Sequence, residues 1–113
     1  MGQEELTMCR SKIDALDAQL LEVLNRRAQV AQELGALKRR YGLPLCDLER
    51  ESAVLAKALE NNPGPLEDAS VLSIFQHVIR ECRRVQDGQA SVQRYPETGQ
   101  ASQGVNGNDH QYE

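Results

Sequence analysis

The sequence predicts an all-α protein with three helices per chain, one of them very long, that associates into an intertwined homodimer. Apolar residues recur at helical spacing in three stretches of residues 1–86, and no stretch alternates apolar and polar residues as a half-buried strand does. The following residues, 87–113, include four glycines and show no apolar periodicity. Such a segment buries too little surface to offset the entropy of ordering it. We therefore expect one helical domain over residues 1–86 and a disordered tail over residues 87–113.

The first predicted helix runs from about residue 5 to residue 41 and carries one apolar stripe. The stripe consists of Ile13, Leu16, Leu20, Leu24, Ala31 and Leu34, which share one face of a helix with about 3.6 residues per turn. No proline interrupts this stretch, and Gly42 followed by Pro44 marks its end. Gly35 lies inside it, although glycine costs about 1 kcal/mol there relative to alanine. An interior glycine of this kind indicates the close approach of another chain segment.

Two shorter helices are predicted beyond this turn. One begins near Asp47, whose side chain is a good N-cap, and stops at the cluster of helix breakers over residues 61–65. The other runs from about residue 66 to Gln86. Its apolar stripe consists of Val71, Leu72, Phe75, Val78, Ile79, Cys82 and Val85.

The length of the first helix predicts a second copy of the chain. A helix over residues 5–41 is a rod of about 55 Å, whereas a compact domain over residues 1–86 has a radius of gyration near ~12 Å. Two short helices cannot cover a rod of this length. A second copy of the same rod is the simplest partner for the rest of the stripe, the alternative being a solitary helix with a frayed end.

Composition disfavours several classes of protein. The chain has 13 basic and 17 acidic residues and a formal net charge of −4, which argues against a partner that is nucleic acid or a membrane surface. No basic segment followed by an apolar run opens the sequence, and no run approaches the roughly 18 apolar residues that span a bilayer. We therefore expect a cytoplasmic protein. Cys9, Cys46 and Cys82 form no close pair, and neither histidine has a ligand partner nearby, so we expect reduced thiols and no metal.

Two cations occupy the face of the first helix that should be buried. Arg27 and Lys38 continue the apolar stripe and, eleven residues apart, lie within about 20° of each other. A buried cation is unfavourable unless it is paired. One such residue at the edge of a stripe commonly reaches solvent, but two on one line indicate a pocket for a small anion. Arg10 lies 17 residues before Arg27, about 25 Å away, so it can contribute only to the site of the other subunit.

The shorter helices carry two further polar pairs at a spacing of four residues. Asp47 and Glu51 share a face at the start of the second helix. Taken alone, an N-cap and a solvated acidic first turn that suits the helix dipole explain this pair better than a site does. Cys82 and Gln86 end the stripe of the third helix, where a solvent-facing last turn is the simpler interpretation.

The order and spacing of these residues resemble those of the all-helical chorismate mutases. The similarity lies in Arg10-x-x-Ile13-Asp14-x-Leu16-Asp17, Leu24-Asn25-Arg26-Arg27 and Lys38 of the first helix, in Pro44-x-x-Asp47-x-x-Arg50-Glu51, and in residues 74–86. It covers about residues 5–86. The resemblance implies the intramolecular rearrangement of chorismate to prephenate, on the route to phenylalanine and tyrosine, which needs no metal, cofactor or nucleophile.

The resemblance also implies roles for the cations. Arg27, together with Arg10 of the partner subunit, would bind the two substrate carboxylates, for which the bidentate and permanently charged guanidinium is well suited. Lys38 and Gln86 would donate to the ether oxygen, where negative charge gathers in the transition state. Catalysis would consist of holding the dianion in its reactive chair form and stabilising this charge.

Further roles follow from the same resemblance. Glu51, with the backbone at Asp47, would take the substrate hydroxyl, while Arg50 would add positive potential near the carboxylates and hold Glu51 in place. Cys82 stands where many relatives have a serine that helps to bind a carboxylate. Since a thiol is a weaker donor than a hydroxyl, we expect weaker substrate binding, unless Cys82 only packs in the core. Arg26 should point outward, about 100° away from the line of Lys38.

Three alternatives stand beside this interpretation. One is a lyase on the same fold that removes pyruvate from isochorismate; the acidic pair Asp47 and Glu51 favours the mutase, because the two substrates carry their hydroxyl at different positions. A non-catalytic dimerisation module would tolerate apolar residues at Arg27, Lys38 and Gln86. The mutase part of a bifunctional protein is disfavoured, since the chain is too short for a second catalytic domain and its tail is expected to be an end rather than a linker.

Overall fold

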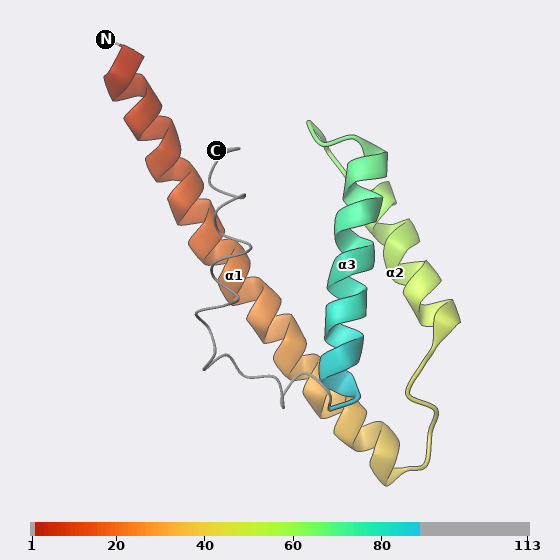
Figure 1. Ribbon diagram of the computed structural model, residues 1–113. Helices are drawn as coiled ribbons and strands as arrows, with labels where there is room; N and C mark the ends of the chain where they lie inside the picture. The colour runs from red at the N-terminus through yellow and green to blue at the C-terminus, as the bar shows by residue number, and fades with distance from the viewer. Residues whose placement is uncertain (1, 89–113) are drawn as a thin grey trace.

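The computed structural model describes residues 2–88, which form three α-helices and, within that range, no strand (Figure 1). The helices are α1 (Gly2–Arg40), α2 (Leu48–Glu60) and α3 (Asp68–Gln86). The predicted all-α class is therefore confirmed. Asp87 and Gly88, the first residues of the predicted tail, form the turn that closes α3. The rest of that tail, residues 89–113, lies outside the described residues, so its disorder stays a prediction.

α1 is a rod that runs the full length of the molecule. Its 39 residues correspond to about 58 Å of helix, which accounts for the longest dimension of 61 Å. α3 packs against both α1 and α2, and the α2–α3 pair diverges from the N-terminal half of α1 like the second arm of a V (Figure 1). As a result, Leu16 and Leu20 of the predicted stripe are 60% and 57% exposed. Of the buried apolar side chains, Ala31, Ile79 and Cys82 lie where the arms meet, whereas Val71 lies near the start of α3 beside α2.

A glycine turn ends α1 where the sequence predicted. Gly42 adopts a positive φ of 66°, which L-residues with a side chain rarely adopt. The Leu43 N–H donates to the carbonyl of Lys38 at 2.8 Å, and the Gly42 N–H donates to that of Arg39 at 3.3 Å. This pair of bonds is a Schellman motif, which satisfies carbonyls that the end of a helix leaves without partners. It ends the helix within one turn of Lys38.

A side-chain cap sets the start of α2, whereas α3 begins after Glu67, whose side chain makes no capping hydrogen bond. Asp47 has extended backbone, and its Oδ1 accepts from the Arg50 N–H at 3.0 Å, so the predicted N-cap of α2 is confirmed. α3 begins two residues later than predicted. Asn62 Nδ2 donates to the Leu66 carbonyl and to Asp68 Oδ1, both at 2.9 Å, and so keeps the segment before Asp68 in a turn.

The close approach predicted at Gly35 is confirmed, and it fixes the end of α3. Gly35 is buried against the last residue of that helix: an added Cβ would lie 2.9 Å from Gln86 Cγ and 3.1 Å from its carbonyl carbon. Arg39 Nη1 donates a hydrogen bond to the carbonyl oxygen of Gln86 at 2.9 Å. The absence of a side chain at Gly35 therefore lets the C-terminal turn of α3 sit beside Lys38.

Candidate active site

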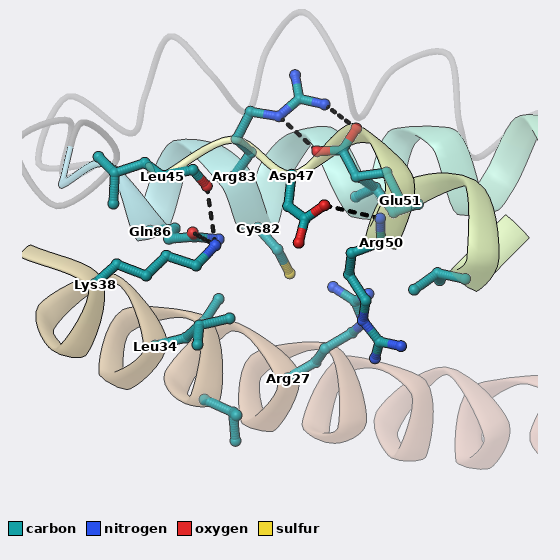
Figure 2. Close-up of a pocket in the computed structure, with 14 residues that line it drawn as sticks. Arg27, Leu34, Lys38, Leu45, Asp47, Arg50, Glu51, Cys82, Arg83 and Gln86 are labelled. Carbon is teal, nitrogen blue, oxygen red and sulfur yellow. Dashed lines mark hydrogen bonds and ion pairs between the residues drawn. The ribbon is translucent and has the colours of Figure 1, made fainter. Parts of the chain in front are cut away.

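A pocket of about 250 Å³ opens where the three helices meet (Figure 2). Its apolar wall is formed by Val30, Ala31, Leu34, Leu45, Val54 and Ile79. Its polar lining consists of Arg27, Lys38, Asp47, Arg50, Glu51, Cys82, Arg83 and Gln86. An apolar wall with a few convergent polar groups is typical of a small-molecule site.

Seven of the eight residues singled out in the sequence line this one pocket. The exception is Arg10, which is exposed on α1 about 25 Å from Arg27 along the helix. Arg27 is half-buried whereas Arg26 is exposed, so the predicted outward direction of Arg26 is confirmed. The pocket thus unites side chains from all three helices within one chain, and the roles inferred for them stay predictions.

Lys38 and Gln86 meet at one end of the pocket (Figure 2). Lys38 Nζ donates to Gln86 Oε1 at 2.8 Å and to the Leu45 carbonyl oxygen at 3.0 Å. An ammonium has three donors, so one N–H of Lys38 is left, together with the amide NH₂ of Gln86. The Schellman turn after Lys38 and the glycine contact at Gln86 hold both side chains in place. Two donors are therefore fixed at a common point on the pocket wall.

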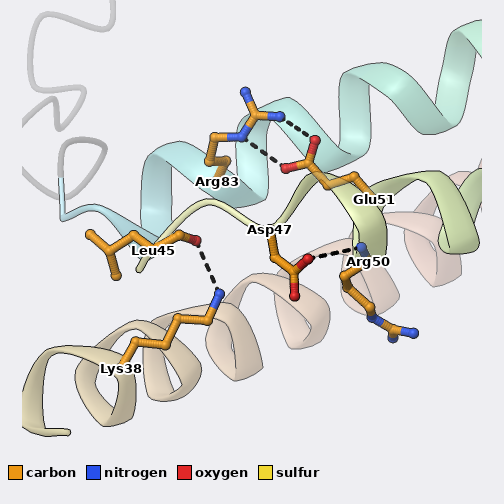
Figure 3. A network of polar contacts seen from close by, with 6 residues as sticks. All are labelled: Lys38, Leu45, Asp47, Arg50, Glu51 and Arg83. Carbon is orange, nitrogen blue, oxygen red and sulfur yellow. Dashed lines mark hydrogen bonds and ion pairs between the residues drawn. The ribbon is translucent and has the colours of Figure 1, made fainter. Parts of the chain in front are cut away.

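The opposite wall contains an ion pair that sequence reasoning assigned to the wrong arginine. Arg83 Nε donates to Glu51 Oε2 at 3.0 Å, and its Nη2 donates to Oε1 at 2.5 Å (Figure 3). We expected Arg50 to hold Glu51, but Arg50 points away from it, toward Arg27 (Figure 2). The reason is helical geometry, since adjacent residues project about 100° apart. The hydrogen bond to Glu51, partly opposed by desolvation, raises the pKa of Arg83, which keeps this guanidinium charged.

No sequence signal pointed to Arg83. Its partner lies 32 residues earlier on another helix, and helical periodicity relates only residues of the same helix. The Leu45 carbonyl was missed for a similar reason, because a backbone acceptor has no signature in the side-chain sequence. Cys82, by contrast, is both buried and part of the pocket lining, as each of its two interpretations requires.

The pocket favours an anion. Four basic and two acidic side chains line it, and Arg27, Lys38 and Arg50 have no carboxylate partner among residues 2–88. Cations that are fixed at an apolar wall bind carboxylates more strongly than they do in bulk water. The arrangement therefore suits a small molecule with more than one negative charge.

Other kinds of site find little support in the part of the chain that the structure describes. Cys9, Cys46 and Cys82 are all free thiols. Within residues 2–88, no cluster of three or more His, Cys, Asp or Glu side chains could hold a metal ion. In the same range, no helix has both the length and the apolar character needed to cross a membrane.

Comparison with known proteins gives consistent matches. Residues 9–87 match the family Chorismate mutase type II. The bifunctional chorismate mutase/prephenate dehydratase of Neisseria gonorrhoeae is 43% identical over 77 residues, which are 68% of this chain and 21% of that protein. The chain therefore spans about a fifth of the length of this relative.

Two other relatives are small proteins, and this chain matches most of the length of each. The 4-amino-4-deoxychorismate mutase of Streptomyces venezuelae is 30% identical, over 75% of this chain and 84% of that protein. The chorismate mutase (Form II) from Thermus thermophilus superimposes with a TM-score of 0.73 at 28% identity, covering 75% of this chain and 97% of the other. The pocket, the helices that build it and these matches all agree. The chain belongs to the chorismate mutase type II family.

Proposed function

We propose that the chain catalyses the rearrangement of chorismate to prephenate. The observation that carries the proposal is the convergence of Arg27, Lys38 and Gln86 on one pocket with an apolar wall. Chorismate is a dianion that must be held in a chair form before its ether bond breaks and its new carbon–carbon bond forms. Fixed cations can hold the two carboxylates, and the apolar wall can exclude water from the ring.

The residues have distinct roles in this reaction. Arg27 binds one carboxylate, with Arg50 adding positive potential beside it. The remaining N–H of Lys38 and the amide NH₂ of Gln86 donate to the ether oxygen, which gains negative charge as its bond to carbon lengthens. Glu51 accepts the hydrogen bond of the ring hydroxyl. Since the reaction is intramolecular and transfers no proton to the protein, these contacts are sufficient.

The first test is to follow the loss of chorismate absorbance with the purified protein beside the variant Lys38→Ala. Lys38 supplies one of two donors to the ether oxygen, so its loss should lower kcat on the order of a hundredfold or more. Arg26→Ala is the matched control, because it removes an exposed cation of the same helix and should retain parental rates. A folded parent that leaves chorismate unchanged would contradict the proposal, and isochorismate would then be assayed for the release of pyruvate.

The active form is an intertwined homodimer that shares its sites between subunits. Two features support this: the N-terminal half of α1 exposes its apolar stripe, and a groove of about 560 Å³ lies beside the active pocket. The groove is lined by Arg27, Arg50, Val54, Lys57, Ala58, Asn61, Asn62, Pro63, Val71 and Phe75. It has Arg27, Arg50 and Val54 in common with the pocket. A helix of the partner subunit seated there would bring its own Arg10 next to both cations and to the substrate carboxylates.

Mixed dimers test this sharing directly. Arg10→Ala and Lys38→Ala homodimers should both be nearly inactive, but refolding them together in equal amounts should restore about one quarter of the parental activity. The mixed dimer then has one site with an intact Lys38 and an intact Arg10 from the other subunit. If Arg10 acted within its own chain, or not at all, mixing would restore nothing beyond the sum of the two homodimers.

The amino analogue of chorismate is the second substrate to assay. The Streptomyces venezuelae relative is named for 4-amino-4-deoxychorismate, which has an amino group in place of the ring hydroxyl. The wall that faces this position in our proposal contains Glu51 paired with Arg83, which favours the neutral hydroxyl. We therefore expect chorismate to be the preferred substrate. The cytoplasmic location inferred from the sequence stays a prediction.

A further inference from the structure

The Glu51–Arg83 pair has the geometry of a clamp rather than of a passing surface contact. Both nitrogens of the guanidinium edge engage both oxygens of one carboxylate, at 3.0 and 2.5 Å. The side chains are only 22% and 37% exposed, and the pair joins α2 to α3. A bidentate, partly buried pair fixes the direction of the carboxylate, because rotating it would break two charge-assisted hydrogen bonds at once.

The Glu51–Arg83 ion pair lies between the active pocket and a second groove. Glu51 and Arg83 line the active pocket, and they also line a groove of about 380 Å³ with Leu55, Gln76, His77, Ile79 and Arg80, to which α1 contributes no residue. Figure 2 shows Arg83 on the side of Glu51 that faces away from Lys38 and Arg27. Arg83 therefore reaches Glu51 from behind, leaving the pocket side of the carboxylate for a ligand.

Pairing with Arg83 cancels the negative charge that Glu51 contributes to this wall, while the charge of Asp47 is the same in every variant of the pair. A lone carboxylate facing the ring would attract an ammonium group strongly and a hydroxyl group more weakly, because hydrogen bonds with two charged partners are the stronger ones. With Arg83 bound, the carboxylate can still accept a hydrogen bond through its remaining lone pairs. An ammonium at the same position meets the guanidinium charge directly behind the carboxylate, and this opposes its binding.

We propose that Arg83 is a positioning and specificity-determining residue, which forms with Glu51 a neutral pair that accepts a ring hydroxyl and rejects a ring ammonium. The inference rests on the proposed function, since it assumes that Glu51 faces the ring substituent of the substrate. It makes the charge of the wall, rather than its shape alone, the basis of selection between chorismate and its amino analogue.

The test compares kcat/KM for 4-amino-4-deoxychorismate with kcat/KM for chorismate in a series of variants. Arg83→Gln leaves the pair negative and should raise this ratio on the order of tenfold. Glu51→Gln leaves it positive and should lower the ratio below that of the parent. The double variant restores neutrality, so its ratio should return toward the parental value, although its rates stay low. A merely structural role of Arg83 predicts no such return.

Two further variants sharpen the result. Arg83→Lys keeps the charge but only one contact, so it should retain the parental ratio while kcat for chorismate falls. Arg84→Gln removes the neighbouring arginine, which pairs with Glu81 on the surface, and should change neither quantity. Should Arg83→Gln fail to fold, an unchanged or raised ratio in Glu51→Gln would still overturn the inference.

The outcomes separate this inference from the function on which it depends. A parent that does not convert chorismate overturns the proposed function. A parent that converts chorismate, but whose ratio shifts no more in Arg83→Gln than in Arg84→Gln, overturns only the role of Arg83. A ratio that follows the charge of the wall in all four variants of the pair supports both.

Discussion

Replacing Gly35 by alanine should reduce activity far more than stability. The new Cβ would overlap the backbone carbonyl oxygen of Gln86 and lie 2.9 Å from Gln86 Cγ, whereas carbon atoms in contact are about 3.5–4.0 Å apart, so the last turn of α3 must retreat on the order of 1 Å. The Lys38–Gln86 hydrogen bond, now 2.8 Å, would then be lost. A displacement of about 1 Å in an active site lowers the rate by about a hundredfold, which is the effect we expect on kcat.

The loss of stability should not exceed about 2 kcal/mol, because two effects oppose each other. Overpacking destabilises by about 1–3 kcal/mol, while alanine in place of glycine within a helix stabilises by about 1 kcal/mol, leaving a net loss of about 0–2 kcal/mol. Initial rates of chorismate loss and the thermal unfolding midpoint measure the two quantities. Gly2→Ala is the matched control, since it makes the same change in α1 where nothing lies within 4 Å of the new Cβ. Parental kcat in a folded Gly35→Ala protein would refute the reasoning.

Three further changes test other parts of the structure. Cys82→Ser should lower KM for chorismate in steady-state assays, because a hydroxyl at this pocket position is the better donor; a higher KM would show that Cys82 only packs. Asp47→Ala removes the cap on the Arg50 N–H and should reduce the free energy of unfolding by about 1 kcal/mol, whereas Asp47→Asn should retain most of it in the same denaturant titration. Leu20→Glu places a charge on the exposed stripe and should yield inactive monomers in sedimentation equilibrium; an active dimer would count against the shared-site proposal.

The elements that the sequence predicted well are those governed by interactions close in the chain. The Gly42 turn and the Asp47 cap depend on residues within a few positions of each other, and both are found where expected. Helical spacing likewise placed Arg27 and Lys38 on one face of α1. Glycine inside α1 predicted a close contact, but the sequence could not show that its partner is Gln86, because the packing of α3 on α1 depends on many side chains at once.

The error at Glu51 has the same origin. Arg50 stands next to it in the sequence and shares its motif, so assigning the two to one ion pair required no knowledge of α3. Helical geometry separates these neighbours, and the partner actually bound, Arg83, becomes visible only when α2 and α3 are placed together. Long-range pairs between charged residues are the features that a single sequence determines least, since any of several arginines could satisfy one carboxylate.

The residues of the site also share a place in their helices that suits the proposed chemistry. Lys38 lies in the last turn of α1, Asp47 caps the start of α2, and Gln86 is the last residue of α3. A reaction that uses neither covalent chemistry nor proton transfer depends on how accurately its donors are placed. Helix ends fray unless they are secured, and here a Schellman turn, an N-cap and a glycine contact secure them. Residues such as Gly35, which meet no substrate, should therefore control kcat as strongly as some that do.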